Sequence, residues 1–155
     1  MHGRRLAASR RAVLALFTGS THTCAVLDNN ATLCFGKNDH GQLGLDSTDS
    51  SRGKITGDTA SSIVQVPPGT SVVSGSAGLF HTCVVLDDGR ALCFGRNDKG
   101  QLGLDRTYSA RGSAAGETAS AIVQVPQGAS VVSISAGPKH TCVVLLDGRA
   151  LCFGD

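Results

Sequence analysis

Short runs of apolar and β-branched residues alternate with turn-forming residues along most of the chain. In the middle of the sequence these runs are 72–77, 81–86, 91–95 and 122–125. Runs of this length, bounded by Gly, Asn and Asp, predict β-strands rather than helices. Apolar residues also occupy consecutive positions, as in 83–86, so both faces of the predicted sheet should be covered by neighbouring structure.

The same pattern of strands and turns occurs almost three times along the chain. His-Thr-Cys recurs at 22–24, 81–83 and 140–142, a spacing of 59 residues, and Cys-Phe-Gly follows each copy. A period of this length is typical of repeat folds in which each unit buries its apolar faces against the next. Four strands per unit predict an all-β fold, a partial β-propeller of about 2.75 four-stranded blades. The predicted division is a basic N-terminal arm (1–12), blade 1 (13–66), blade 2 (67–125) and an incomplete blade 3 (126–155).

Each copy carries two cysteines on adjacent predicted strands. A turn at Gly89 places Cys83 opposite Cys93, in a register that permits a disulfide bond. Buried reduced thiols remain an alternative, and the choice depends on the redox compartment. A zinc site from His81 with the two cysteines is disfavoured, because no fourth ligand recurs. The candidate disulfide residues are Cys24, Cys34, Cys83, Cys93, Cys142 and Cys152.

Composition and charge narrow the function classes. Four of the 14 Lys and Arg residues lie at Arg4, Arg5, Arg10 and Arg11, which leaves ten against 12 acidic residues in the repeat body. Nucleic acid is therefore not an expected partner, apart from weak contact by the arm. The apolar run after the arginines aligns with the first strand of the later copies, so a strand is expected there rather than a signal peptide. No run approaches the ~20 apolar residues of a membrane span.

The motif Ala-Gly-x-x-His-Thr, followed by Leu-x-Asp-Gly-Arg and by Gly-x-Asn-x-x-Gly-Gln-Leu-Gly, resembles the repeat of the regulator of chromosome condensation family. The resemblance implies a propeller, usually of seven blades, with Phe35, Phe94 and Phe153 where that family usually has Trp or another aromatic residue. It also implies that the histidines are hydrogen-bonded residues that anchor the blade at the strand start. The cysteine pair is similar to that of extracellular relatives. The repeat-motif residues are His22, Gly36, Asn38, Gly41, Gln42, Gly44, His81, Gly95, Asn97, Gly100, Gln101, Gly103, His140 and Gly154.

Two long segments, 46–62 and 105–121, interrupt the repeats between the predicted third and fourth strands. They are rich in Ser, Thr, Gly and Ala and differ between copies while the flanking strands stay constant. Variable loops on a constant scaffold are expected sites of partner binding, although drift in an unstructured linker fits equally well. The candidate binding residues are Asp49, Arg52, Lys54, Asp58, Tyr108, Arg111 and Glu117.

No catalytic constellation emerges, and no cofactor or metal is expected. The predicted function is a non-catalytic protein–protein interaction scaffold whose partner the sequence does not identify. Two alternatives stay open: a regulator of a small GTPase with guanine-nucleotide exchange activity, and a secreted or cell-surface propeller that acts as an inhibitor or receptor ectodomain. Oxidised cysteines would place the chain outside the cell, and reduced ones in the cytoplasm or nucleus. Because the outer blade faces are predicted to be open, a homo-oligomer in which several chains complete one propeller is a further possibility.

Overall fold

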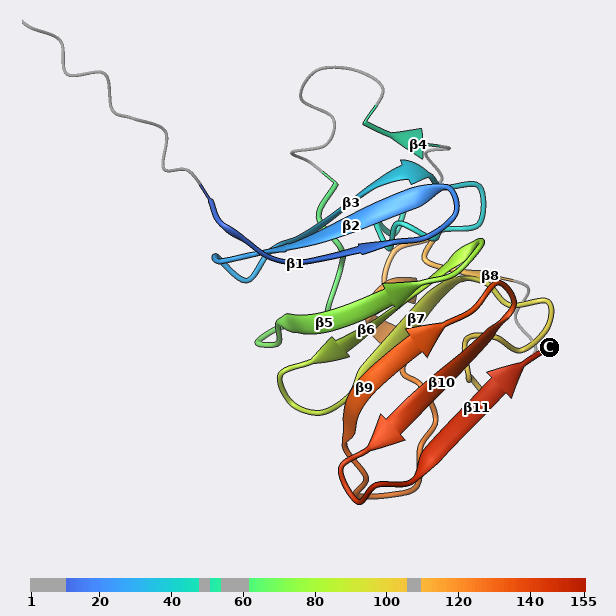
Figure 1. Cartoon of the computed structure of the whole chain (residues 1–155). Helices are drawn as coiled ribbons and strands as arrows, with labels where there is room; N and C mark the ends of the chain where they lie inside the picture. The colour runs from blue at the N-terminus through green and yellow to red at the C-terminus, as the bar shows by residue number, and fades with distance from the viewer. Residues whose placement is uncertain (1–10, 48–50, 54–61, 106–109) are drawn as a thin grey trace, which may run out of the picture.

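The computed structural model describes residues 11–47, 51–53, 62–105 and 110–155. Three antiparallel sheets lie face to face and fan out from one side of the molecule (Figure 1). We call them blade 1, blade 2 and blade 3. Blade 1 comprises β1 (Val13–Thr18), β2 (His22–Leu27), β3 (Thr32–Lys37) and β4 (Ser51–Arg52). Blade 2 comprises β5 (Val72–Ala77), β6 (His81–Leu86), β7 (Ala91–Arg96) and β8 (Ala110–Arg111). Blade 3 comprises β9 (Val131–Ala136), β10 (His140–Leu145) and β11 (Ala150–Gly154).

The predicted hairpin register is confirmed. In blade 2, Val85 pairs with Ala91 and Cys83 with Cys93. The turn between these strands holds Gly89 at a φ of 82°, a left-handed conformation that Gly adopts at little steric cost. In blade 1, Asn30 takes the corresponding conformation at a φ of 66°. The chemistry of one turn therefore fixes which side chains face each other along the whole hairpin.

The predicted fourth strand at 122–125 is wrong. Ile122 forms only an isolated bridge to Leu92, and the fourth strand of blade 2 is the two-residue β8. Two backbone bonds flank this bridge, from the Val123 N–H to the Ala91 carbonyl oxygen at 2.9 Å and from the Cys93 N–H to the Ala121 carbonyl oxygen at 3.0 Å. The Gln124 N–H, on the other side of the segment, binds the Gly103 carbonyl oxygen at 2.9 Å. The intervening loop also contains a short helix that the sequence pattern did not predict, α1 (Glu117–Ser120).

The core consists of two layers, each formed between neighbouring blades. The first layer joins the face of blade 1 that carries Cys24 and Cys34 to the face of blade 2 that carries Leu92 and Phe94. The second joins the opposite face of blade 2 to blade 3. Blade 2 therefore contacts blade 1 through one face and blade 3 through the other. Burial of apolar area between blades, rather than within them, stabilises the fold.

Candidate functional site

The repeated histidines connect neighbouring blades. His22 Nε2 lies 2.6 Å from Thr82 Oγ1 in the next blade, and the Thr82 hydroxyl donates to the Gln42 carbonyl oxygen at 2.7 Å. Because a hydroxyl carries a single proton, which the carbonyl here receives, the histidine ring is the donor through Nε2–H. The contact recurs one repeat later, where His81 Nε2 is 2.9 Å from Thr141 Oγ1. The anchor expected of these residues is thus a hydrogen bond across the blade interface.

Burial keeps these two rings neutral. Desolvation lowers the pKa of His22 from 6.5 to about 4, and it lowers the pKa of His81 to about 4. The space beside each ring is also tightly limited. A methyl group added at Gly78 would overlap the His81 ring and the Gly137 carbonyl oxygen, so only glycine fits there. In blade 3 the equivalent ring, that of His140, is exposed.

The Asn-x-x-Gly-Gln-Leu-Gly segments form turns held by their own hydrogen bonds. In the first copy, Asn38 Oδ1 accepts the Leu43 N–H at 3.0 Å, and Gln42 Oε1 accepts the His40 N–H at 2.9 Å. The second copy repeats both bonds with the same lengths. These residues therefore shape a structural turn. The glycines of the motif that adopt positive φ are Gly36, Gly41, Gly44, Gly95, Gly100, Gly103 and Gly154.

All six cysteines are paired across the hairpins in the predicted combinations, with Cα–Cα distances of 4.1 Å. The disulfides of blades 1 and 2 lie between blades, and all four of their residues are 0% exposed. Cys152 in blade 3 is exposed. The three bonds thus occupy equivalent positions in the repeat but differ in their access to solvent.

The candidate binding loops are described only in part. Asp49, Lys54, Asp58 and Tyr108 lie outside the described residues. Arg52 and Arg111 lie in β4 and β8, and Glu117 begins α1. These positions stay candidates, but the structure shows that one of them has an internal role.

Glu117 holds the loop of blade 2 in shape. Its Oε2 atom accepts three backbone N–H groups, those of Gly112, Ser113 and Ala114, at 2.9 to 3.1 Å. Partial burial would raise the pKa of Glu117, but these hydrogen bonds outweigh it and hold the pKa below its usual value. Asp46 of blade 1 then accepts the N–H groups of Gly116 and Thr118 at 2.7 and 2.8 Å. Residues 112–118 are therefore held in one conformation and tied to the neighbouring blade.

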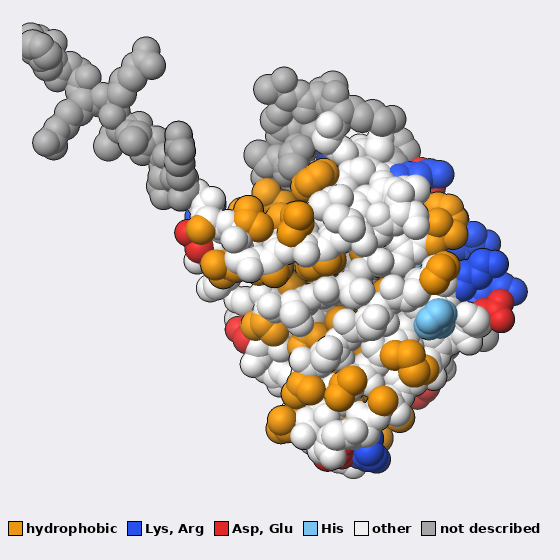
Figure 2. All heavy atoms as spheres, in the orientation of Figure 1, with side chains coloured by type: hydrophobic (Ala, Val, Ile, Leu, Met, Phe, Trp, Pro, Cys, Tyr) orange, Lys and Arg blue, Asp and Glu red, His pale blue; other side chains and the backbone are white. Residues whose placement is uncertain are grey.

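A cluster of basic and aromatic side chains at the same end of the blades was not predicted. The Phe80 ring lies 5.5 Å from Lys37 Nζ, 5.8 Å from Arg96 Cζ and 5.3 Å from the His40 ring. We call these four residues the Phe80 cluster. Figure 2 shows that basic side chains gather at one edge of the molecule, beside a few acidic ones.

The cations of the cluster also have acidic partners. Lys37 binds Asp39 at 2.9 Å, and Arg96 binds Asp98 at 2.6 Å. Phe80 occupies the repeat position where blade 1 has Thr21 and blade 3 has Lys139. An aromatic residue that occurs in one copy only, directly before the constant histidine, is the sequence signal that could have located the cluster.

Comparison with known proteins identifies the repeat. The model of the regulator of chromosome condensation (RCC1) repeat matches residues 13–42, 72–101 and 131–155. The chain belongs to the RCC1 repeat family. It is 33% identical over 134 residues to the human regulator of chromosome condensation, covering 86% of this chain and 28% of that protein. It is 32% identical over 142 residues to the mouse X-linked retinitis pigmentosa GTPase regulator, covering 92% and 13%.

The fold agrees with that assignment. The crystal structure of yeast RCC1 (Prp20) bound to Kap60 superposes with a TM-score of 0.67 at 21% identity, covering 92% of this chain and 32% of that one. The RCC1-type blades of this chain thus span about a third or less of the length of these relatives. Within the described ranges, no helix is long and apolar enough to cross a membrane.

Proposed function

We propose that this RCC1-type chain is a non-catalytic protein-binding scaffold and that the Phe80 cluster is the centre of its binding surface. The observation that carries the proposal is the position of Phe80 between two cations contributed by different blades, Lys37 at 5.5 Å and Arg96 at 5.8 Å. Aromatic and Arg side chains dominate the energetic centres of protein interfaces. Their stacking limits the rotamers available to each, so little conformational entropy is lost when a partner binds.

The order of the neighbouring loop supports the same surface. Glu117 and Asp46 fix the backbone of residues 112–118 through five N–H groups before any partner arrives. A loop that is already ordered presents a defined surface and binds at a lower entropic cost. The yeast RCC1 structure is itself a complex with another protein, Kap60, which agrees with a binding role for this fold.

Affinity capture with matched variants tests this proposal. The wild-type chain, F80A, R96A and L146A are immobilised at equal density, and the retained proteins are quantified by mass spectrometry. L146A is the control, because Leu146 is 74% exposed on the hairpin of blade 3. We expect a specific partner to be retained by wild type and L146A and lost with F80A and R96A. Equal retention by all four forms would refute the assignment of the surface.

A second candidate is regulation of a small GTPase. It is favoured by the similarity to the mouse protein named as a GTPase regulator, which covers 92% of this chain. The direct assay is the release of a fluorescent guanine nucleotide from purified GTPases in the presence of the chain. Faster nucleotide release that F80A abolishes would show that the Phe80 cluster also contacts the GTPase. An unchanged release rate would refute this second candidate function.

The three disulfides bear on the compartment. Structural disulfides persist in oxidising surroundings and are rare in the cytosol and nucleus. We therefore propose a secreted or cell-surface location for the scaffold. Thiol counting in protein purified under native conditions without reductant tests the location. Six free thiols would contradict it.

A further inference from the structure

The hairpin turn between β2 and β3 contains a tripeptide that the other two blades lack. Asn30-Ala31-Thr32 has the form Asn-x-Thr, with a residue other than Pro in the middle, which marks an acceptor for an N-linked sugar. Of the four asparagines in the sequence, Asn30 alone has Ser or Thr two positions later. The equivalent residues of the other copies are Gly-Arg-Ala, at 89–91 and 148–150. A three-residue motif also occurs by chance, so the structure around it decides whether the fold itself requires these residues.

The Asn30 side chain is exposed and takes no part in shaping its turn. The Leu27 N–H donates to the Ala31 carbonyl oxygen at 2.9 Å, and the Asn30 N–H donates to the Leu27 carbonyl oxygen at 3.2 Å. The side chain of Asn29 accepts the Ala31 N–H at 3.4 Å. None of the described residues hydrogen-bonds to the Asn30 amide group, so its nitrogen is accessible at the hairpin tip.

Both defining residues of the motif suit the fold less well than their counterparts in blades 2 and 3. Asn30 has a φ of 66°, in the left-handed region where Gly89 and Gly148 lie at 82° and 87°. Gly adopts this conformation at a lower cost than Asn. Thr32 is 3% exposed, and its hydroxyl has no hydrogen-bond partner among the described residues. A buried hydroxyl without a partner costs free energy, whereas the alanines of the other two copies bury no polar group.

We propose that Asn30 is the acceptor of an N-linked oligosaccharide, and that this role accounts for the pair Asn30 and Thr32 in blade 1. The inference rests on the secreted or cell-surface location proposed above, because disulfides and N-linked sugars are both added in the secretory pathway. The sugar is transferred before the hairpin folds, so the later burial of Thr32 does not prevent recognition of the motif.

The transfer needs one co-reactant, an oligosaccharide joined through its anomeric carbon to a polyprenyl diphosphate. Asn30 Nδ2 attacks the anomeric carbon, and a C–N bond forms there. The C–O bond to the diphosphate breaks, and the diphosphate leaves with the bonding electron pair. A base of the transferase takes one proton from the amide nitrogen. The product is a bulky, polar group on an exposed turn.

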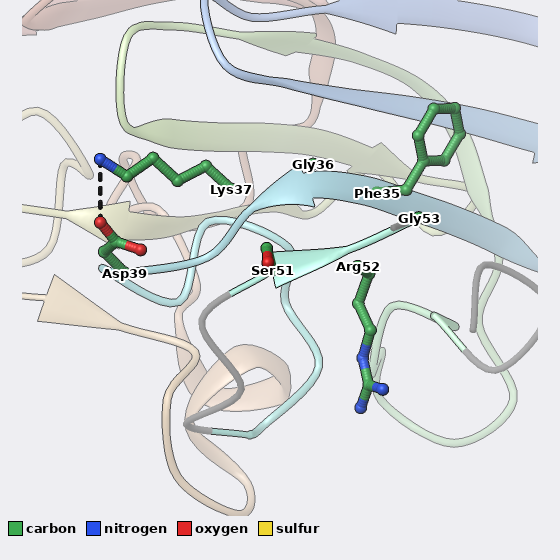
Figure 3. Close-up of a pocket in the computed structure, with 7 residues that line it drawn as sticks. All are labelled: Phe35, Gly36, Lys37, Asp39, Ser51, Arg52 and Gly53. Carbon is green, nitrogen blue, oxygen red and sulfur yellow. Dashed lines mark ion pairs between the residues drawn. The ribbon is translucent and has the colours of Figure 1, made fainter. Parts of the chain in front are cut away.

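The sugar would lie at the end of the blades opposite the Phe80 cluster. β3 begins at Thr32, beside the Asn30 turn, and ends at Lys37, which binds Asp39 at 2.9 Å (Figure 3). The turn between β2 and β3 and the turn between β5 and β6, which carries Phe80, lie at opposite ends of the strands (Figure 1). A glycan at Asn30 therefore leaves the Phe80 cluster accessible to a partner.

The test is secretion of the full chain, behind an appended signal peptide, from cultured mammalian cells. The purified protein is treated with peptide-N-glycosidase F in heavy-oxygen water, and tandem mass spectrometry locates each Asn that becomes Asp. We expect conversion at Asn30 and loss of the mass of one oligosaccharide. N30G and T32V should abolish the modification. The matched controls T32S, which keeps the motif, and N29D, which gives position 29 the residue of the other copies, should stay modified.

A second measurement tests the structural half of the inference without any sugar. T32V removes the hydroxyl but keeps the branched shape of the buried side chain. In protein made in bacteria, with the disulfides formed, T32V should leave the Tm equal to that of the wild type or raise it. A lower Tm would show that the Thr32 hydroxyl stabilises the fold, and this result would overturn the argument that the fold does not require it.

An unmodified Asn30 in the secreted chain would overturn the proposal, and so would equal modification of wild type and T32V. The location proposed above fails by a different result, the free thiols counted in native protein. Intact disulfides together with a bare Asn30 would contradict the acceptor role alone. Free thiols together with a modified Asn30 in the secreted chain would contradict the location alone.

Discussion

Acidification should destabilise the fold through the two histidines buried between blades. Their pKa is lowered from 6.5 to about 4 by desolvation, so the folded state favours the neutral rings. The unfolded chain binds protons first as pH falls below 6.5, and the stability that the neutral rings contribute is lost between about pH 6.5 and pH 4. At pH 5 this linkage amounts to roughly 2 kcal/mol for each ring, or roughly 4 kcal/mol for His22 and His81 together.

The assay is urea unfolding at pH 7, 6 and 5, with the disulfides intact, for the wild type and the double variant H22Q/H81Q. Glutamine retains an N–H donor for the threonine of the next blade but does not titrate. The double variant is less stable at pH 7, but its free energy of unfolding should fall less between pH 7 and pH 5, by roughly 4 kcal/mol. Each single variant should account for about half of that difference. Parallel pH profiles for wild type and double variant would refute the assignment of neutral, buried donors.

Two further perturbations test the packing between blades. G78A should destabilise the fold by at least about 2 kcal/mol, because the methyl group overlaps the His81 ring; thermal unfolding measures this, and an unchanged Tm would contradict the close approach. Mild dithiothreitol under native conditions should reduce Cys142–Cys152 before the 0% exposed Cys83–Cys93 bond. Alkylation followed by peptide mass spectrometry gives the order, and simultaneous reduction would show that the blades separate readily.

The sequence predicts the hairpins well because their determinants are local. Gly89 supplies the left-handed turn residue, and the alternation of side chains beyond it leaves one register that aligns Cys83 with Cys93. Because the sequence repeats every 59 residues, the same hairpin is predicted at the equivalent residues of the other two blades. A single turn and its flanking strands thus account for most of the sheet pairing and for all three disulfides.

The fourth strand was placed wrongly because non-local hydrogen bonds decide it. Ala110 and Arg111 show no strand pattern, and they pair with β7 only where Gly95 and Arg96 leave an open edge. Ile122 does have a strand-like pattern, but its segment pairs with β7 at a single bridge, while the Gln124 N–H on its other side binds the turn at Gly103. A strand of two residues is too short to produce a recognisable pattern in the sequence, so it could not be predicted.

The candidate surface was missed for a similar reason. Lys37 and Arg96 lie in different blades, and they meet at Phe80 only after the blades pack. Glu117 is a different case, because the sequence offers it as a candidate binding residue without indicating an internal role. The structure shows that its carboxylate accepts N–H groups of its own loop. Variation between copies locates loops but does not show which way their side chains point.

Residues one repeat apart meet across the blade interfaces, and a double-mutant cycle of His81 and Thr141 measures such a contact. The Nε2 and Oγ1 atoms of these residues lie 2.9 Å apart although 60 positions separate them in the chain. The free energy of unfolding is measured at pH 7 for the wild type, H81A, T141V and the double variant. We expect a coupling energy of about 1 kcal/mol between the two sites. Strictly additive effects would show that the blades do not pack in this way.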